Sequence, residues 1–179
     1  ELRPAVGVVL GSGLGSFADA VQEAVEVPYG EIPGWPASTA VGHAGTLVVG
    51  RFGGVPVAVM KGRAHLYEGV SPADVVFGVR VLGSLGVRSL VLTNACGAID
   101  PSVEPGRLVA ISDHLNLQGT SPLVGPNDET LGPRFPDMTG AYDAGYRGLA
   151  REAAARIGLD LREGVYAAWL GPAFETPAE

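Results

Sequence analysis

The sequence has few cysteines, no long apolar run and little positive charge, and each of these features marks a class of protein. Its one cysteine in 179 residues, Cys96, cannot form an internal disulfide bond, which favours a reducing compartment. No apolar run approaches the roughly 20 residues that a membrane-spanning helix needs. Twelve basic and nineteen acidic side chains give a net charge of −7, so positive charge to neutralise a nucleic-acid backbone is lacking. We expect a soluble, cytoplasmic protein without nucleic-acid or membrane partners.

Side chains that bind metals are also scarce. The three histidines and Cys96 show neither helical nor C-x-x-C ligand spacing, so we expect no metal site. Cys96 has no clear base partner in the sequence, and we expect a small buried thiol rather than a nucleophile. His114 is expected to be structural, held by a neighbour such as Asp113.

The composition that remains is that of a folded, loop-rich domain. The sequence is 46% hydrophobic, and its 27 glycines and 14 prolines lie between apolar runs without a fixed period. We therefore expect one domain over residues 1–179. The chain begins at Glu1 without a methionine and stops directly after an expected strand and loop. We expect it to be truncated, particularly at the C-terminus.

The order of apolar segments predicts an α/β domain with a mixed sheet. A hairpin is expected at 46–61, because only Phe52, Gly53 and Gly54 separate its two strands. A well-marked helix begins at the N-cap Ser71 and ends at Gly86. The other expected strands are buried runs at 5–10 and 89–93 and two further segments at 108–111 and 164–171. The other expected helices cover 15–25 and 139–158. The second of these helices has Leu149, Ala153 and Ile157 on one stripe. The irregular stretch 117–138 is expected to be a functional loop.

The glycine-rich stretch "VVLGSGLGSF", residues 8–17, follows the first expected strand. Gly11 and Gly13 fit a dinucleotide fingerprint, but its third glycine position falls on Ser16, and a proline-rich turn occupies the place of the second parallel strand and its acid. The P-loop pattern also fails, because no Gly-Lys-Ser/Thr follows. Two interpretations remain: an anion-binding turn with the Ser12 hydroxyl as a donor, or a turn that binds nothing.

A second candidate for anion binding is "KGRAHLYEG", residues 61–69. Arg63, His65 and Tyr67 occupy alternate positions and share one face if the chain stays extended. A guanidinium and an imidazole suit phosphate oxygens, whereas the alternative is a solvated strand end. His43, in the loop before the hairpin, is expected near the same pocket.

Seven short motifs occur in the order and approximate spacing of one enzyme family: "GSGLG", "HAG", "GR-x-H-x-YEG", "TNACG", "GPNDE", "RFPDM" and "GPAFET". The chain resembles the trimeric, low-molecular-mass purine nucleoside phosphorylases over essentially its whole length. The resemblance implies a mixed, strongly twisted central sheet flanked by helices, as in the phosphorylase/hydrolase-like folds. It also implies a homotrimer of purine salvage that carries out reversible phosphorolysis of 6-oxopurine nucleosides. Inorganic phosphate would be a co-substrate, and no metal or organic cofactor is implied.

The same resemblance implies roles for individual residues. Ser12, Arg63, His65 and Glu175 correspond to catalytic residues. The phosphate site corresponds to Ser12, His43, Arg63, Ala64, His65 and Ala95; the ribose site to Tyr67 and, from a neighbouring subunit, Phe135; the purine site to Ala95, Cys96, Gly97, Phe174 and Glu175. The Glu175 carboxylate suits guanine and hypoxanthine, because both present a donor at N1 where adenine presents an acceptor.

The sequence departs from the family pattern in a few places. Ala64 and Ala173 stand where relatives commonly carry an aromatic residue and a serine. The family's asparagine donor to purine N7 lies downstream of "FET", beyond the last residue here. Three alternatives therefore remain: a methylthioadenosine phosphorylase, a non-catalytic protein that binds purine or phosphate, and, last, an NAD-dependent oxidoreductase.

Overall fold

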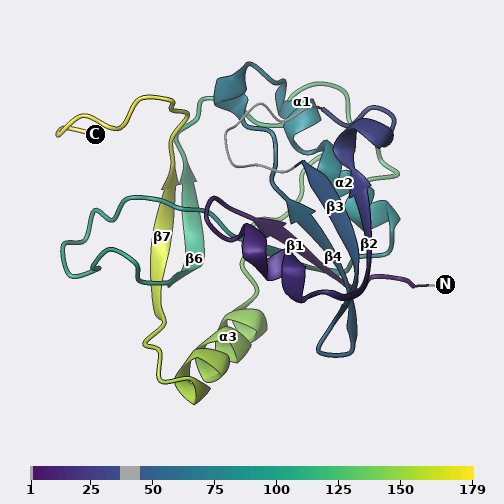
Figure 1. Ribbon diagram of the computed structural model, residues 1–179. Helices are drawn as coiled ribbons and strands as arrows, with labels where there is room; N and C mark the ends of the chain where they lie inside the picture. The colour runs from purple at the N-terminus through teal and green to yellow at the C-terminus, as the bar shows by residue number, and fades with distance from the viewer. Residues whose placement is uncertain (1, 37–44) are drawn as a thin grey trace. The chain divides into compact units, whose positions relative to one another are not determined.

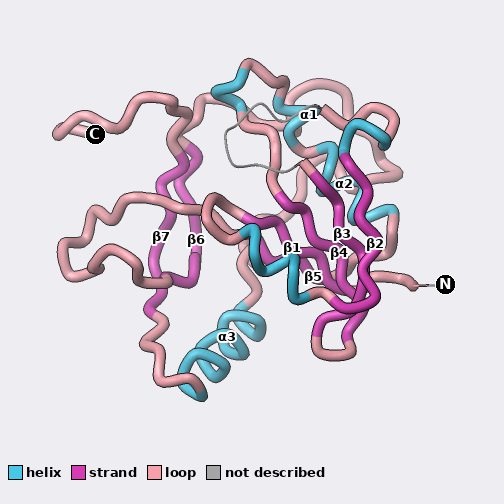
Figure 2. Tube along the Cα trace, in the orientation of Figure 1, coloured by secondary structure: helices cyan, strands magenta, loops and turns pink. Residues whose placement is uncertain are grey.

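The computed structural model describes residues 2–36 and 45–179 (Figures 1 and 2). The chain forms two compact units, Glu1–Cys96 and Gly97–Glu179. Within the described residues, no helix is both long and apolar enough to cross a membrane.

The first unit is built on a mixed five-stranded sheet with the order β2-β3-β4-β1-β5. Its strands are β1 (Val6–Leu10), β2 (Gln22–Pro28), β3 (Thr46–Phe52), β4 (Val55–Lys61) and β5 (Ser89–Leu92). Strand β1 runs parallel to β4 and β5, whereas β3 pairs antiparallel with β2 and β4. The mixed sheet and the predicted β3–β4 hairpin are both confirmed.

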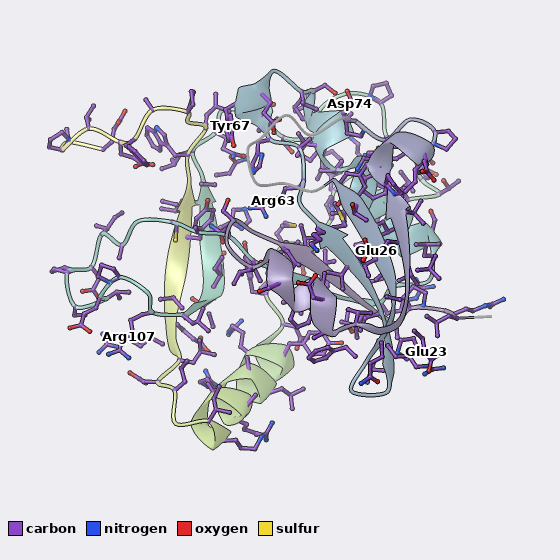
Figure 3. The ribbon with its side chains drawn as sticks, viewed as in Figure 1. Glu23, Glu26, Arg63, Tyr67, Asp74 and Arg107 are labelled. Atoms are coloured by element: carbon purple, nitrogen blue, oxygen red, sulfur yellow. The ribbon has the colours of Figure 1, made fainter. Side chains whose placement is uncertain are left out.

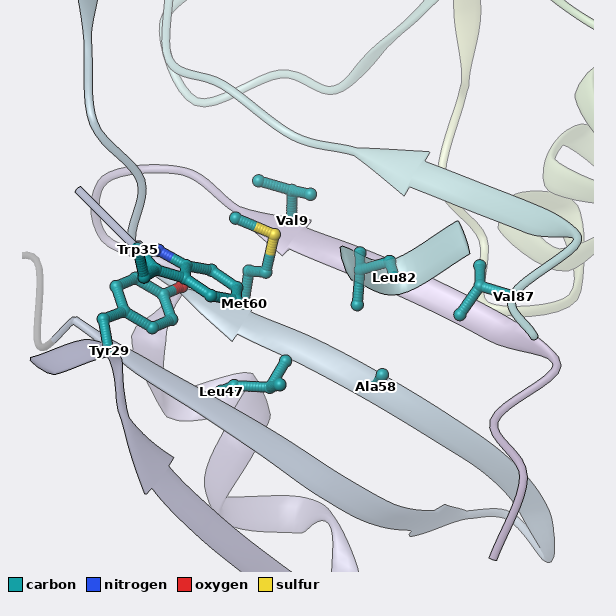
Figure 4. Packing of buried hydrophobic residues seen from close by; sticks show 8 residues of the cluster. All are labelled: Val9, Tyr29, Trp35, Leu47, Ala58, Met60, Leu82 and Val87. Atoms are coloured by element: carbon teal, nitrogen blue, oxygen red, sulfur yellow. The ribbon is translucent and has the colours of Figure 1, made fainter. Parts of the chain in front are cut away.

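The central strands are apolar throughout because both faces of the sheet are covered. Successive side chains of a strand point to opposite faces, so Val9 joins one buried cluster while Val8 and Leu10 join the other. Helix α2 (Phe77–Ser84) packs on the first face through Leu82, as Figure 4 shows. The short 3-10 helix η1 (Gly15–Ala20) covers the second face.

The parallel pairing brings three strand ends to one edge of the sheet. Leu10 of β1 is in register with Lys61 of β4, and Val9 is in register with Leu92 of β5. Parallel neighbours finish on the same side, so the segments that follow β1, β4 and β5 start close together. These segments contain most of the candidate residues of the first unit.

The predicted start of the helix at Ser71 is confirmed. The Ser71 hydroxyl accepts from the Asp74 amide at 3.2 Å and donates to the Asp74 carboxylate at 2.7 Å. The helical segment is divided into α1 (Pro72–Val75) and α2, and it ends before Gly86, whose φ is +103°.

The predicted helix over 15–25 is wrong. Only the six residues of η1 are helical, and the chain then enters the edge strand β2. Gln22, Glu23 and Ala24 have no strong strand preference, but hydrogen bonding to β3 overrides local propensity. The register shifts between Gln22 and Val25, and Glu23 has a φ of +51°, which marks a bulge.

Strand β5 was expected to be buried, and this is also wrong. In the described residues β5 pairs only with β1, and Val91 and Leu92 are 50% and 61% exposed. An edge strand lacks a neighbour on one side, so an apolar sequence by itself does not ensure burial.

The second unit contains a two-stranded parallel sheet of β6 (Val109–Asn116) and β7 (Arg162–Ala168). Helix α3 (Ala144–Arg156) connects them and begins at Asp143, whose carboxylate accepts from the Tyr146 amide at 2.8 Å. The helix is shorter than predicted. Leu149 and Ile157, expected on one apolar stripe, are exposed, and the buried residue is Ala154.

The predicted irregular stretch between β6 and α3 is confirmed, since residues 117–143 contain neither helix nor strand. Arg134 organises part of it, because its Nη1 donates to the carbonyls of Leu123 at 2.9 Å and Gly125 at 2.8 Å. The adjacent Phe135 is 88% exposed. The loop thus has internal order although it lacks regular structure.

Candidate functional site

The guanidinium of Arg63 joins the ends of three strands. Arg63 follows β4, and its Nη1 donates to the carbonyl of Leu10 at 3.1 Å and to the carbonyl of Thr93 at 3.0 Å. Leu10 closes β1 and Thr93 follows β5, so one side chain connects all three parallel strands. These contacts place a fixed positive charge at the carboxyl edge of the sheet (Figure 3).

The glycine turn after β1 is held against the segment that follows β5. The Gly11 amide donates to Thr93 Oγ1 at 2.8 Å, and the Leu14 amide donates to the Gly11 carbonyl at 3.2 Å. A Cβ atom at Gly11 would lie 2.8 Å from both the Thr93 carbonyl oxygen and the Asn94 Cα, so only glycine permits this close approach. The turn is therefore built on backbone contact between distant segments.

Ser12 lies at the exposed tip of this turn. Within the described residues, its hydroxyl has no hydrogen-bond partner, whereas the Gly11 amide is already used by Thr93. The group that this turn offers to an incoming anion is therefore the Ser12 hydroxyl rather than the Gly11 amide.

Thr93 is a residue of this site that the sequence did not single out. Its hydroxyl donates to the Val9 carbonyl at 2.9 Å while it accepts from Gly11, so it links β1 to the end of β5. The available signal is a hydroxyl residue at the end of an apolar run, directly before a small-residue loop. That signal is weak without knowledge that the two strands are neighbours.

His65 is held by a carboxylate three residues later. Glu68 Oε1 accepts from the His65 amide at 2.7 Å and lies 2.8 Å from His65 Nδ1, and the Glu68 side chain is only 4% exposed. A carboxylate acceptor at Nδ1 keeps the proton on that atom, which leaves Nε2 for a ligand. The sequence did not identify Glu68, although the spacing of a capping box was present.

Tyr67 does not share an extended face with Arg63 and His65 as expected. The chain turns into the 3-10 helix η3 (Leu66–Glu68) after His65, which ends the alternation. The Tyr67 and His65 rings nevertheless stack, with centroids 4.8 Å apart and planes at 21°. The two side chains stay adjacent by stacking rather than by strand geometry.

Ala64, Ala95 and Cys96 complete the candidate residues of the first unit. Ala64 is buried, at 7% exposure, between Arg63 and His65. Ala95 and Cys96 follow β5 and are exposed. The expected burial of the Cys96 thiol is therefore wrong, because β5 ends at Leu92 and leaves Cys96 in the loop beyond the sheet.

The remaining candidates lie in the second unit or outside the described residues. Gly97, Phe135, Phe174 and Glu175 belong to the second unit, and all four are exposed. His43 lies outside the described residues. His114 contacts the Tyr142 hydroxyl through Nδ1 at 3.1 Å, so its partner is Tyr142 rather than the expected Asp113 carboxylate, which accepts from the His114 amide.

Strands β1 and β4 end at the same edge of the sheet, and the segments that follow them carry the candidate side chains of Ser12 and of Arg63, His65 and Tyr67, respectively. The hydroxyl of Ser12 and the guanidinium of Arg63 offer donors that suit an oxyanion. Nearby, Lys61 Nζ pairs with Asp19 at 2.9 Å. Among the described residues, no three His, Cys, Asp or Glu side chains are grouped so that they could hold a metal ion.

Comparison with known proteins connects this geometry to named relatives. The chain is 54% identical over 176 residues to purine nucleoside phosphorylase 1 of Geobacillus stearothermophilus, covering 98% of this chain and 64% of that protein. It is 48% identical over 184 residues to purine nucleoside phosphorylase of Mus musculus, covering 100% of this chain and 64% of that protein. The chain therefore spans less than two thirds of the length of these relatives.

Solved structures show the same fold. Purine nucleoside phosphorylase of Schistosoma mansoni, described as a complex with adenosine, is 42% identical with a TM-score of 0.94 over 99% of this chain and 64% of that one. A purine nucleoside phosphorylase described as a complex with ribose-1-phosphate is 42% identical with a TM-score of 0.95, over 99% of this chain and 67% of that one. The family model of the phosphorylase superfamily matches residues 5–179. The chain therefore belongs to the phosphorylase superfamily.

Proposed function

We propose that the protein catalyses the reversible phosphorolysis of 6-oxopurine ribonucleosides and deoxyribonucleosides. Phosphate would displace the base and give a free purine and (deoxy)ribose 1-phosphate. The observation that carries this proposal is that Ser12, Arg63 and His65 lie in segments that leave the same carboxyl edge of the parallel strands β1 and β4. It is supported by relatives named purine nucleoside phosphorylase and by one described as a complex with ribose-1-phosphate.

In this proposal the first unit holds the phosphate. The Ser12 hydroxyl and the Arg63 guanidinium donate to phosphate oxygens, and His65 Nε2 accepts from the hydroxyl of hydrogen phosphate, with His43, Ala64 and the Ala95 amide completing the site. Phosphate bound in this way stabilises the positive charge that develops on the sugar as the glycosidic bond breaks. Donors that are already in place do not have to reorganise during the reaction.

The residues proposed to bind the purine are Ala95, Cys96, Gly97, Phe174 and Glu175. In this proposal the Glu175 carboxylate accepts from N1–H of the purine, and Phe174 packs against the ring. Tyr67 contacts the ribose. We further propose a homotrimer in which the exposed Phe135 reaches the sugar bound by a neighbouring subunit.

Several broader properties also belong to this proposal. The chain is proposed to form part of one nucleoside phosphorylase domain that acts in cytoplasmic purine salvage. Phosphate is the co-substrate, and no metal or organic cofactor is required by the chemistry proposed for these residues.

The test is release of hypoxanthine from inosine by the full-length protein with and without inorganic phosphate. Strong dependence on phosphate is expected, and ribose 1-phosphate should appear in an amount equal to the hypoxanthine. Equal release without phosphate would indicate a hydrolase and would contradict the proposal.

Arg63→Ala should raise the KM for phosphate strongly while the protein still folds, because the mutation removes the charge at the sheet edge. Arg51→Ala is a matched control, since Arg51 lies on β3 and donates to the Gly54 carbonyl at 3.0 Å, away from the candidate site. An unchanged phosphate dependence in Arg63→Ala would remove Arg63 from the phosphate site.

The second candidate function is phosphorolysis of an adenine nucleoside such as methylthioadenosine. The observation that favours it is a similar structure described as a complex with adenosine. The proposed acceptor Glu175 argues against it, because adenine presents no N1–H. Parallel assays with inosine and methylthioadenosine distinguish the two, and purine binding without turnover of either would indicate a non-catalytic binding protein.

A further inference from the structure

A buried tyrosine is bonded to the residue that precedes Arg63. The hydroxyl of Tyr29 donates to the carbonyl of Gly62 at 2.7 Å, in a buried contact between residues 33 positions apart. Tyr29 begins the short 3-10 helix η2 (Tyr29–Glu31), which follows the edge strand β2. The contact therefore joins the segment that follows the edge strand β2 to the residue before Arg63, whose guanidinium is the candidate anion-binding group.

Gly62 is the point at which the chain leaves β4. Strand β4 ends at Lys61, and Gly62 has a φ of +103°, a conformation that favours glycine. After this change of direction, the Arg63 side chain reaches the carbonyls of Leu10 and Thr93. The orientation of the peptide between Gly62 and Arg63 therefore sets the position from which the Arg63 side chain extends.

Tyr29 is itself firmly placed. It is 3% exposed, and its ring stacks on Trp35 with centroids 4.2 Å apart and planes at 18° (Figure 4). Trp35 in turn meets the edge of Phe77 at 5.8 Å. A hydroxyl on a ring fixed in this way has a defined position rather than a range of positions.

A second connection joins Tyr29 to the end of β4 through the backbone. The Tyr29 amide donates to the Gly45 carbonyl at 2.8 Å, and the Gly45 amide donates to the Lys61 carbonyl at 3.0 Å. The carbonyls of Lys61 and Gly62, which belong to two successive peptide units, are thus connected to Tyr29, the first through Gly45 and the Tyr29 amide and the second through the Tyr29 hydroxyl. The Gly62–Arg63 peptide and the peptide before it are therefore both held in place.

The hydroxyl is a dependable donor. Burial raises the pKa of Tyr29 above its ordinary value, so the phenol keeps its proton throughout the neutral range. Leaving the buried Gly62 carbonyl without a hydrogen-bond donor costs free energy, so this hydrogen bond stabilises the folded protein.

We propose that Tyr29 is a positioning residue for the anion site, acting on Arg63 through the Gly62 carbonyl. This inference rests on the proposed function, because Arg63 is taken to bind phosphate. Tyr29 lies in the core and acts only through the peptide that it holds. Loss of its hydroxyl should loosen the Gly62 peptide and misplace the guanidinium while the base site is unaffected.

The experiment compares Tyr29→Phe with Phe77→Leu in the full-length protein. Both changes disturb the same aromatic cluster, but only the first removes a bond to Gly62. Tyr29→Phe should raise the KM and the dissociation constant for inorganic phosphate about fivefold to tenfold and leave the inosine KM within twofold. Phe77→Leu should lower the melting temperature without changing the phosphate constants. Equal phosphate constants in Tyr29→Phe and wild type would overturn the inference.

A double mutant tests the route through Arg63. In an Arg63→Ala background, Tyr29→Phe should raise the phosphate KM by less than a further twofold, because the group that it positions is already gone. Fully additive effects would show that Tyr29 acts elsewhere and would contradict the inference.

Failure of the proposed function gives a different result from failure of this inference. If the wild-type protein neither binds phosphate nor cleaves inosine, the proposed function is wrong. The positioning role is then decided by a crystal structure of Tyr29→Phe. Displacement of Arg63 Nη1 from the Leu10 and Thr93 carbonyls would support the role, and unchanged contacts would exclude it.

Discussion

The amide of Gly11 donates to the hydroxyl of Thr93 at 2.8 Å, although 82 residues separate them in the sequence. The same hydroxyl donates to the Val9 carbonyl at 2.9 Å. One side chain thereby satisfies a donor and an acceptor of the first strand and its turn, and holds Ser12 at the sheet edge.

Thr93→Val should therefore weaken both the fold and the site. Valine has nearly the same shape but leaves the Gly11 amide without its acceptor, so the free energy of unfolding should fall by about 1–3 kcal/mol. The KM for phosphate should rise as well. Urea denaturation and phosphate kinetics measure the two effects. Thr93→Ser keeps the hydroxyl and should retain most of both properties; similar losses in the two variants would show that the hydroxyl is not responsible.

Gly11→Ala should be severely destabilising, because the new methyl group would lie 2.8 Å from backbone atoms of Thr93 and Asn94, which cannot move independently. We expect a loss of about 1–3 kcal/mol, typical of overpacking in a well-packed region. Gly15→Ala is the matched control at the start of η1, since its Cβ would meet only the Lys61 side chain at 3.7 Å. Thermal unfolding of the two variants should differ clearly, and equal melting temperatures would contradict the close approach.

Glu68→Ala should raise the phosphate KM several-fold, because Glu68 Oε1 holds both the amide and Nδ1 of His65. Glu68→Gln keeps a carbonyl oxygen at this position and should change the KM much less. The expected order is wild type, then the glutamine variant, then the alanine variant. If glutamine is as harmful as alanine, the negative charge of Glu68 rather than its hydrogen bonding to His65 is required.

Alkaline pH should destabilise the fold partly through Tyr29. Burial raises the pKa of this phenol above its ordinary value of about 10, so above that pH the unfolded chain loses the Tyr29 proton while the folded protein keeps it. The corresponding stability is complete below about pH 10 and is lost as the pH rises further. Urea midpoints near pH 8 and pH 10.5 should fall more for wild type than for Tyr29→Phe. Equal falls would show that ionisation of Tyr29 does not contribute.

Features with a local cause could be predicted from the sequence. The cap at Ser71 and the hairpin at Phe52–Val55 depend on residues close together in the chain, and both were identified with nearly correct limits. The helix expected over 15–25 failed because β2 is decided by its pairing with the distant strand β3. Local propensity carries no information about that partner.

In the candidate site, too, residues in local motifs could be predicted, whereas residues that act through distant contacts could not. Ser12, Arg63 and His65 stand in recognisable motifs, and the structure places them near the same sheet edge. Thr93 and Tyr29 were missed because their importance comes from contacts with Gly11 and Gly62, 82 and 33 residues away. Cys96 was misjudged because burial depends on where β5 ends rather than on the hydrophobicity of the thiol.

The bulge in β2 has a consequence for solubility. The outer edge of a sheet can recruit a strand from another molecule, which is a common beginning of aggregation. Here the register shift between Gln22 and Val25 interrupts the regular spacing of backbone donors and acceptors, and Glu23 and Glu26 place negative charge on the same strand (Figure 3). A second copy of the chain would meet irregular spacing and like charge at this edge. Strand β2 therefore protects the sheet from growing into a fibre in that direction.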